Sequence, residues 1–180
     1  MVSPKGKAVG STPTRCAIYF LKGIKILDKE KFMREALKEA KKAYDKEEIP
    51  VGVVIVKDGK VIARGHNLKE TDKNAVHHAE IIAINKASKK LDNWRLIDCD
   101  MYVTLEPCTM CIGAIISSRI KKIFVGTMDE KAGACGSVLN VLDYKFNHKV
   151  ELETGILKEE CEYILKDFFK MLREKSGGAK

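Results

Sequence analysis

The chain has 180 residues, of which 45% are hydrophobic, and a formal net charge of +8. This length suits one globular domain with a sizeable core, and the apolar fraction argues against intrinsic disorder. No apolar run approaches the roughly 18 residues of a membrane-spanning helix, so we expect a soluble, cytoplasmic protein without a membrane partner. Its six cysteines fit a reducing compartment better than a disulfide framework, which makes metal binding by some of them a hypothesis.

The positive charge is concentrated at the start of the chain. Residues 1–27 carry five basic residues and no acidic one, whereas the remainder has a net charge of only +3. The overall charge is therefore weak evidence for a polyanionic partner. We predict that residues 1–27 form a disordered basic extension. Their composition also suits an organellar transit peptide, which is the minor alternative for the compartment.

From residue 28 onward, hydrophobic periodicity predicts helices and strands in alternation. The first helix, residues 28–48, is amphipathic and ends before Pro50. Apolar strands at residues 51–56 and 61–66, joined by the turn KDGK, predict a hairpin, and a polar loop follows at residues 67–74. The later predicted elements are a helix at 77–91, a strand at 101–106, a helix at 108–118, a strand at 121–127 and a helix at 157–175.

The order of these elements predicts the fold class. Strands that alternate with helices after an initial hairpin indicate an α/β protein, a three-layer α/β/α sandwich around a mixed sheet. Residues 28–175 are expected to form this domain, and residues 176–180 a disordered tail.

The strongest chemical signal lies at the starts of two predicted helices, in the segments HHAE and EPCTMC. Cys108 and Cys111 are three residues apart, so both sulfurs can lie on one helix face and bind one metal ion. A lone CxxC could also be redox-active or half of a structural zinc site, but the sequence has no second CxxC. One histidine with two cysteines leaves a position on zinc for water, as in a catalytic site.

The choice between the adjacent histidines follows from the spacing to Glu80. Only His78 has a glutamate two residues later; His77 does not. His78 therefore joins Cys108 and Cys111 as a predicted ligand of one zinc ion per subunit. Glu80, beside the metal, is the predicted catalytic proton shuttle. A core or capping histidine at position 78 and a solvated Glu80 are the alternatives, but they do not explain the match to the cysteine motif.

The pattern H-x-E…P-C-x-x-C is the signature of zinc-dependent nucleobase deaminases. Longer segments extend the likeness: EEIPVGVVIVKDGKVIARGHN, HAEIIAI, NWRLIDCDMYVTLEPCTMCIGAIISSRIKKIFVG, DEKAGACGS and NHKVELETGILKEECEYILKDFFKMLR. Together they resemble the bacterial tRNA-specific adenosine deaminases of the cytidine/deoxycytidylate deaminase superfamily, over about residues 32–174. The resemblance implies a cytidine-deaminase-like fold, in which the mixed sheet has five strands, and a homodimer. It also implies hydrolytic conversion of adenosine to inosine at the wobble position of a tRNA anticodon loop, mainly that of an arginine tRNA.

The same resemblance implies further site residues. Asn67, in GHN, would hydrogen-bond the flipped base, and Asp129, in the segment DEKAGACGS, would hold the RNA backbone. Phe169 and Lys131 are further candidate substrate contacts, because aromatic rings stack on bases and lysines bind phosphates; the helical spacing of Phe169 suits core packing equally. A zinc-activated hydroxide would attack C6 of adenine while Glu80 moves protons. Residues 140–149 look shorter than in relatives, so no RNA contact is predicted there.

Two other functions remain open from the sequence. A deaminase of a free nucleobase or nucleotide, such as guanine or cytosine, would keep the same zinc site. The DFF segment of the last predicted helix and the DEKAGACGS loop favour the tRNA enzyme over it. A zinc-stabilised RNA-binding module without chemistry would have no need for Glu80 beside an open metal position.

Overall fold

The computed structural model describes the backbone of residues 15–177 and the side chains of residues 28–177. Its helices are α1 (Arg15–Tyr44), α2 (Ala79–Leu91), α3 (Thr109–Ser117) and α4 (Lys158–Gly177), with a short 3-10 helix, η1 (Val141–Asp143). Its strands are β1 (Gly52–Lys57), β2 (Lys60–His66), β3 (Cys99–Leu105), β4 (Lys122–Thr127) and β5 (Glu151–Thr154). None of the helices in this described part is long and apolar enough to cross a membrane.

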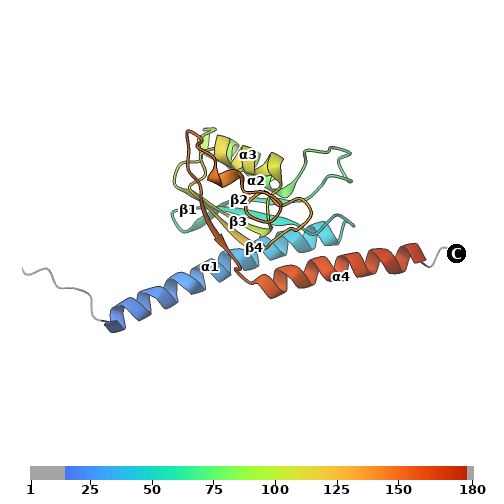
Figure 1. Cartoon of the computed structure of the whole chain (residues 1–180), viewed down its shortest axis with the longest axis horizontal. Helices are drawn as coiled ribbons and strands as arrows, with labels where there is room; N and C mark the ends of the chain where they lie inside the picture. Colours follow the sequence, from blue (N-terminus) through green and yellow to red (C-terminus); the bar gives the residue numbers. More distant parts are fainter. Residues whose placement is uncertain (1–14, 178–180) are drawn as a thin grey trace, which may run out of the picture.

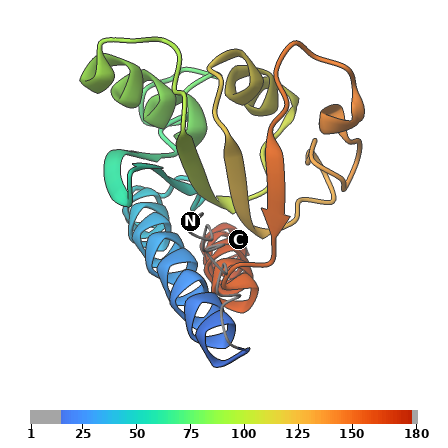
Figure 2. The ribbon, with the colours of Figure 1, turned by 90° about the vertical axis from the view of Figure 1, so that its left-hand side faces the viewer.

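The strands form one mixed sheet of five strands in the order β2-β1-β3-β4-β5. Strand β1 runs antiparallel to both β2 and β3, whereas β3, β4 and β5 are parallel to one another. Helices α2 and α3 lie on one face of the sheet, and α1 and α4 lie on the other (Figures 1 and 2). The predicted three-layer α/β/α sandwich with a mixed five-stranded sheet is confirmed.

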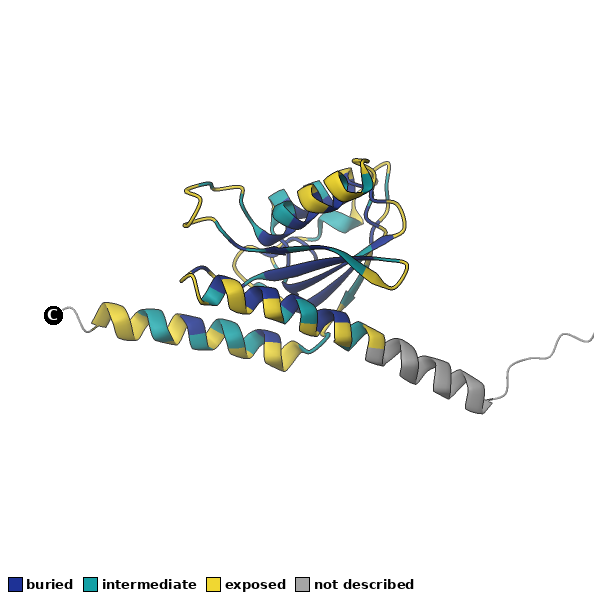
Figure 3. Cartoon of the chain, turned by 180° about the vertical axis from the view of Figure 1, so that it is seen from behind, coloured by how far each residue is buried: buried dark blue, intermediate teal, exposed yellow. Residues whose placement is uncertain are grey.

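The two faces of the sheet have separate cores, because successive side chains of a strand point to opposite sides. Val53 and Ile55 of β1 pack into the core beneath α2 and α3, and the intervening Val54 packs into the core beside α1. Tyr102 and Phe124 stack in this second core with their ring centroids 4.4 Å apart. The buried residues of α1 form a stripe that faces the sheet (Figure 3), as its amphipathic pattern predicts.

Some boundaries differ from the predictions. Helix α1 begins at Arg15 instead of residue 28, so the backbone is helical through the later part of the predicted extension; residues 1–14 lie outside the described residues. Helix α4 continues to Gly177, into the predicted tail, and residues 178–180 again lie outside. Strand β5 was not predicted as a separate element, because its four residues are too few to show a clear alternation. The division of the chain into extension, domain and tail stays a prediction.

Candidate metal centre and active-site cavity

The predicted metal ligands lie where the N-terminal ends of α2 and α3 meet. His78 is the N-cap residue of α2, Cys108 is the N-cap residue of α3, and Cys111 lies in the first turn of α3. Both N-cap residues have extended backbones, and neither side chain caps its helix. Since these side chains do not hydrogen-bond to the helix ends, the imidazole of His78 and the thiol of Cys108 are available to bind one ion together.

The three side chains have the spacing that one tetrahedral metal ion requires. The Nδ1 atom of His78 lies 3.5 Å from the Sγ atom of Cys111 and 3.7 Å from that of Cys108. A tetrahedral zinc ion with Zn–N and Zn–S bonds of ~2.0 and ~2.3 Å separates its nitrogen and sulfur ligands by ~3.5 Å. Among the residues whose side chains are described, these form the one group of three or more His, Cys, Asp or Glu residues whose ligand atoms all lie within 4.8 Å of one another. They therefore constitute a metal-binding group whose donors suit zinc.

The electrostatics of this group favour a thiolate at Cys108. Hydrogen bonds from the Cys111 thiol and from His78 lower the pKa of Cys108 to about 3, although its burial acts in the opposite direction. The hydrogen bond to ionised Cys108 and burial in turn raise the pKa of Cys111. A bound cation would remove this opposition, because a thiol that coordinates a metal gives up its proton.

Glu80 lies in the first turn of α2 and its side chain is buried. Burial raises the pKa of Glu80, because its charged form is deprived of water. Glu80 and His78 line a cavity of about 230 Å³, and Cys108, Asn67 and Asp129 line it as well. The structure thus brings the predicted proton shuttle, two of the predicted ligands and two of the predicted substrate contacts to one cavity.

His77 lies outside the metal-binding group. Its Nδ1 atom is 2.7 Å from a carboxylate oxygen of Asp72, and both side chains are partly exposed. This pair links the residue before His78 to the preceding loop, and His77 is not one of the three residues of the metal-binding group.

A buried carboxylate that the sequence analysis left unassigned holds one wall of the cavity. Glu106 accepts hydrogen bonds from the backbone N–H groups of Asp129 at 2.9 Å, Cys135 at 2.7 Å and Ser137 at 3.2 Å. Burial by itself raises the pKa of Glu106, but these bonds and one from the Ser137 hydroxyl outweigh it and lower the pKa. A side chain at Gly133 would collide with this carboxylate. Glu106 therefore fixes the loop that carries Asp129.

A second buried carboxylate contacts another residue that lines the cavity, Asn67. Glu48 accepts a hydrogen bond from the side-chain amide of Asn67 at 3.2 Å and another from the backbone N–H of Thr71 at 2.6 Å. The sequence signal for both glutamates is faint: each is an acidic residue within two positions of a proline beside a buried strand.

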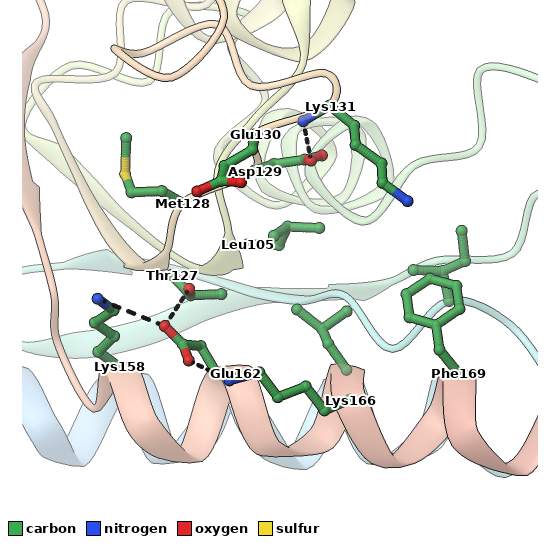
Figure 4. A pocket seen from close by; sticks show the side chains of 12 residues that line it. Leu105, Thr127, Met128, Asp129, Glu130, Lys131, Lys158, Glu162, Lys166 and Phe169 are labelled. Carbon is green, nitrogen blue, oxygen red and sulfur yellow. Dashed lines mark hydrogen bonds and ion pairs between the residues drawn. The ribbon is translucent and has the colours of Figure 1, made fainter.

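A larger groove adjoins the cavity. It has a volume of about 640 Å³ and lies between α4 and the loop after β4, and it shares Ile49, Leu105 and Asp129 with the cavity. Figure 4 shows Phe169 of α4 and Lys131 of the loop on this groove. Phe169 is 41% exposed, whereas its neighbour Phe168 is 1% exposed, so only Phe169 is available for stacking.

Comparisons with known proteins show which proteins the chain is similar to. The family model of MafB19-like deaminases matches residues 27–173. The chain is 47% identical to a tRNA-specific adenosine deaminase of Bacillus subtilis over 152 residues, which cover 84% of this chain and 94% of the relative. It is 48% identical to a tRNA-specific adenosine deaminase of Haemophilus influenzae over 147 residues, covering 81% and 85% of the two chains.

The chain is also similar in fold to solved structures of deaminases. One, from biochemical and structural studies of A-to-I editing by tRNA:A34 deaminases at the wobble position of transfer RNA, has a TM-score of 0.73 and 40% identity and covers 74% of this chain and 98% of its own. A guanine deaminase from Nitrosomonas europaea, with a TM-score of 0.65 and 21% identity over 77% of this chain and 83% of its own, shares the fold. Because the sequence identity is high along nearly the whole length of the curated relatives, the chain belongs to the family of tRNA-specific adenosine deaminases.

Proposed function

We propose that the protein converts adenosine to inosine by hydrolytic deamination at the wobble position of tRNA anticodons. The observation that carries this proposal is the metal-binding group of His78, Cys108 and Cys111 beside the buried carboxylate of Glu80 in one cavity. The cavity adjoins a larger groove, and the family membership supplies the substrate class.

The donor set supports zinc as the cofactor, with one ion per subunit. Two sulfurs and one nitrogen at tetrahedral spacing are typical zinc ligands, and three protein ligands leave one position for water. When bound, zinc supplies a water molecule whose pKa is lowered to ~7 and which can attack at neutral pH.

The other residues of the cavity have distinct proposed roles. Glu80 takes a proton from the attacking water and delivers protons to the ring nitrogen and the departing amine, so that ammonia leaves. Asn67 hydrogen-bonds the flipped base, since its amide lines the cavity beside Glu80. Asp129 lines both the cavity and the groove, which supports a role in holding the RNA backbone beside the reactive nucleotide.

The residues that line the groove support the proposal that the substrate is a nucleic-acid chain and not a free base. Phe169 offers an exposed ring for stacking and Lys131 offers a charge for phosphate, as single-stranded nucleic acid requires. An unpaired anticodon base can be flipped at low cost, because it has no partner strand to leave. By the same family membership we propose an arginine tRNA as the main substrate, a homodimer as the functional state and the cytoplasm as the compartment.

The test is a comparison of substrates. Zinc-loaded protein is incubated with an anticodon stem-loop that carries adenosine at the wobble position and, separately, with free adenosine, guanine and cytosine. We expect inosine from the stem-loop and no turnover of the free compounds. Turnover of guanine or cytosine with an unreactive stem-loop would instead establish a deaminase of free bases on the same metal site.

A further inference from the structure

Asn67 and its loop depend on one buried carboxylate. Asn67 is the first residue after β2, lines the cavity and is 7% exposed. Its Nδ2 atom donates to Oε2 of Glu48 at 3.2 Å, and the backbone N–H of Thr71 donates to Oε1 of Glu48 at 2.6 Å. The two oxygens of one side chain therefore hold the cavity residue and the loop that follows it.

Glu48 is itself firmly placed. It lies in the connection between α1 and β1, is 1% exposed, and its backbone N–H donates to the carbonyl of Ala43 at 3.0 Å. The preceding Glu47 has a left-handed backbone, with φ of 60°, and its exposed side chain pairs with Lys175. This turn sends two adjacent glutamates in opposite directions: Glu47 to the surface and Glu48 to the interior.

The chemistry of a carboxylate fixes the amide of Asn67 in one of its two orientations. An ionised carboxylate only accepts hydrogen bonds, so it can face the NH2 end of the amide but not the carbonyl end. If the amide turned over, two acceptors would oppose each other in a buried place, which is costly. The carbonyl and the second N–H of Asn67 are thereby held in fixed positions at the cavity wall.

We propose that Glu48 is a positioning residue, which sets the orientation of the Asn67 amide for the base and does not itself touch the substrate. This inference rests on the proposed function. It differs from a merely structural role for Glu48 because it requires the effect on the reaction to pass through Asn67.

The variant Glu48→Gln is suited to test this, because it keeps the shape of the side chain and one carbonyl oxygen for the N–H of Thr71. Its NH2 group then faces Asn67, so the amide of Asn67 must turn over to present its carbonyl. A charge-assisted hydrogen bond is lost, and we expect kcat/KM on the anticodon stem-loop to fall by about tenfold to a hundredfold. Glu47→Gln, the matched control, should keep kcat/KM within about twofold of the unmodified protein, as is usual for surface changes.

The decisive comparison is a double-mutant cycle with Asn67→Ala. If Glu48 acts through Asn67, adding Glu48→Gln to Asn67→Ala should change the rate by less than about twofold. Rates are measured in single turnovers with protein in excess, so that slow variants remain measurable. Circular dichroism and metal content are measured alongside and should match the unmodified protein, because Glu48 does not contact the metal-binding group. If Glu48→Gln does not fold, Glu48→Asp replaces it in the same cycle, and its loss should likewise vanish without Asn67.

Two results would overturn the inference: full activity of Glu48→Gln, or losses that multiply in the double variant. Neither bears on the proposed function, which fails only if the unmodified protein forms no inosine. The unmodified protein is therefore assayed first, and the cycle is interpreted against its rate.

Discussion

His78 and Cys108 occupy helix N-cap positions where serine, threonine, aspartate or asparagine would usually satisfy a backbone N–H. Forgoing such a cap costs about 1 kcal/mol per helix. In return, both side chains point to Cys111 and to one another, at the distances of a tetrahedral site. The positive end of each helix also lies beside the ligands, where it stabilises a thiolate.

Metal content provides the residue-scale prediction. Cys111→Ser should retain less than about a tenth of the zinc bound by the unmodified protein after dialysis, because a hydroxyl is a far poorer zinc ligand than a thiolate. Cys99→Ser is the matched control, since Cys99 is also buried but lies outside the metal-binding group. Elemental analysis of the two variants measures this. Equal zinc in both would show that Cys111 is not a ligand.

Some residues of the metal-binding group and the cavity could be predicted from the sequence, and others could not. His78, Glu80, Cys108 and Cys111 were predictable because they stand in short motifs whose spacing has a chemical meaning. Asn67 and Asp129 were available only through resemblance to a family. Glu48 and Glu106 have only a faint sequence signal, because their hydrogen bonds are mostly to backbone N–H groups or to residues distant in the chain.

At the scale of elements, close backbone contacts set the position of the metal-binding group. A side chain at Gly65 of β2 would collide with the carbonyl oxygen of Ala79, the first residue of α2. Only glycine therefore lets the start of α2, with His78 and Glu80, approach the sheet this closely. Gly65 thus affects the position of the metal-binding group relative to the sheet, although it takes no part in metal binding itself.

The different surroundings of two glycines predict opposite effects of their substitution on stability. Gly65→Ala should lower the free energy of unfolding by about 1–3 kcal/mol and should reduce activity, because α2 must move away from β2. Gly113→Ala, within α3, meets no atom within 4 Å and should raise the free energy of unfolding by about 0.5–1 kcal/mol. Urea denaturation of both variants checks this, and a Gly65→Ala protein as stable as the unmodified one would contradict the account.

The edge strand β5 shows why a short element escapes prediction. Glu153 of β5 bonds Lys29 of α1 at 2.6 Å and Lys122 of β4 at 2.9 Å, so β5 is held partly by charges from distant segments. Its four residues offer too little alternation for hydrophobic periodicity to reveal a strand. The longer strands β1, β3 and β4, with almost entirely buried side chains, were predictable.

The charges on Glu153 predict a pH-dependent contribution to stability. Burial raises the pKa of Glu153, but hydrogen bonds from Lys29 and Lys122 outweigh it, so the folded pKa lies below the ordinary 4.5. The contribution is therefore present above pH 4.5 and is lost as the pH falls through the folded pKa. Glu153→Gln should cost less than about 1 kcal/mol at pH 7, since both partners are partly exposed, and the difference should vanish in acid. The control is Glu151→Gln, at an exposed neighbour 3.9 Å from Lys122, and it should change the free energy of unfolding little at either pH. Denaturation of both variants at pH 7 and in acid checks this. A loss of stability in Glu153→Gln that persists in acid would contradict it.

At the scale of the whole molecule, α4 contributes one side chain to the core and the next to the groove. Phe168 packs edge-on against Tyr44 at a centroid distance of 5.5 Å, and Phe169 lies on the groove that adjoins the cavity. The hydrophobic pattern of this helix is consistent with Phe168 on the buried face. The surroundings of Phe169 could not be predicted, because the position of α4 relative to the loop after β4 is a tertiary fact.

The two phenylalanines should therefore separate stability from substrate use. Phe168→Ala should lower the free energy of unfolding by about 3–5 kcal/mol, as expected for a buried aromatic residue. Phe169→Ala should change it by less than about 1 kcal/mol, yet raise KM for the stem-loop by about fivefold to a hundredfold through the loss of base stacking. Thermal unfolding and steady-state kinetics distinguish the two. An unchanged KM in Phe169→Ala would remove this groove from the substrate surface.

The central claim is that the metal-binding group and Glu80 together hydrolyse the amine of a wobble adenosine. Mass spectrometry of the anticodon stem-loop, after incubation with zinc-loaded protein in water enriched in heavy oxygen, tests it most directly. We expect inosine that carries one solvent oxygen, and no product with Glu80→Gln at equal zinc content. Intact adenosine with the folded, zinc-loaded unmodified protein, or equal inosine from Glu80→Gln, would contradict it.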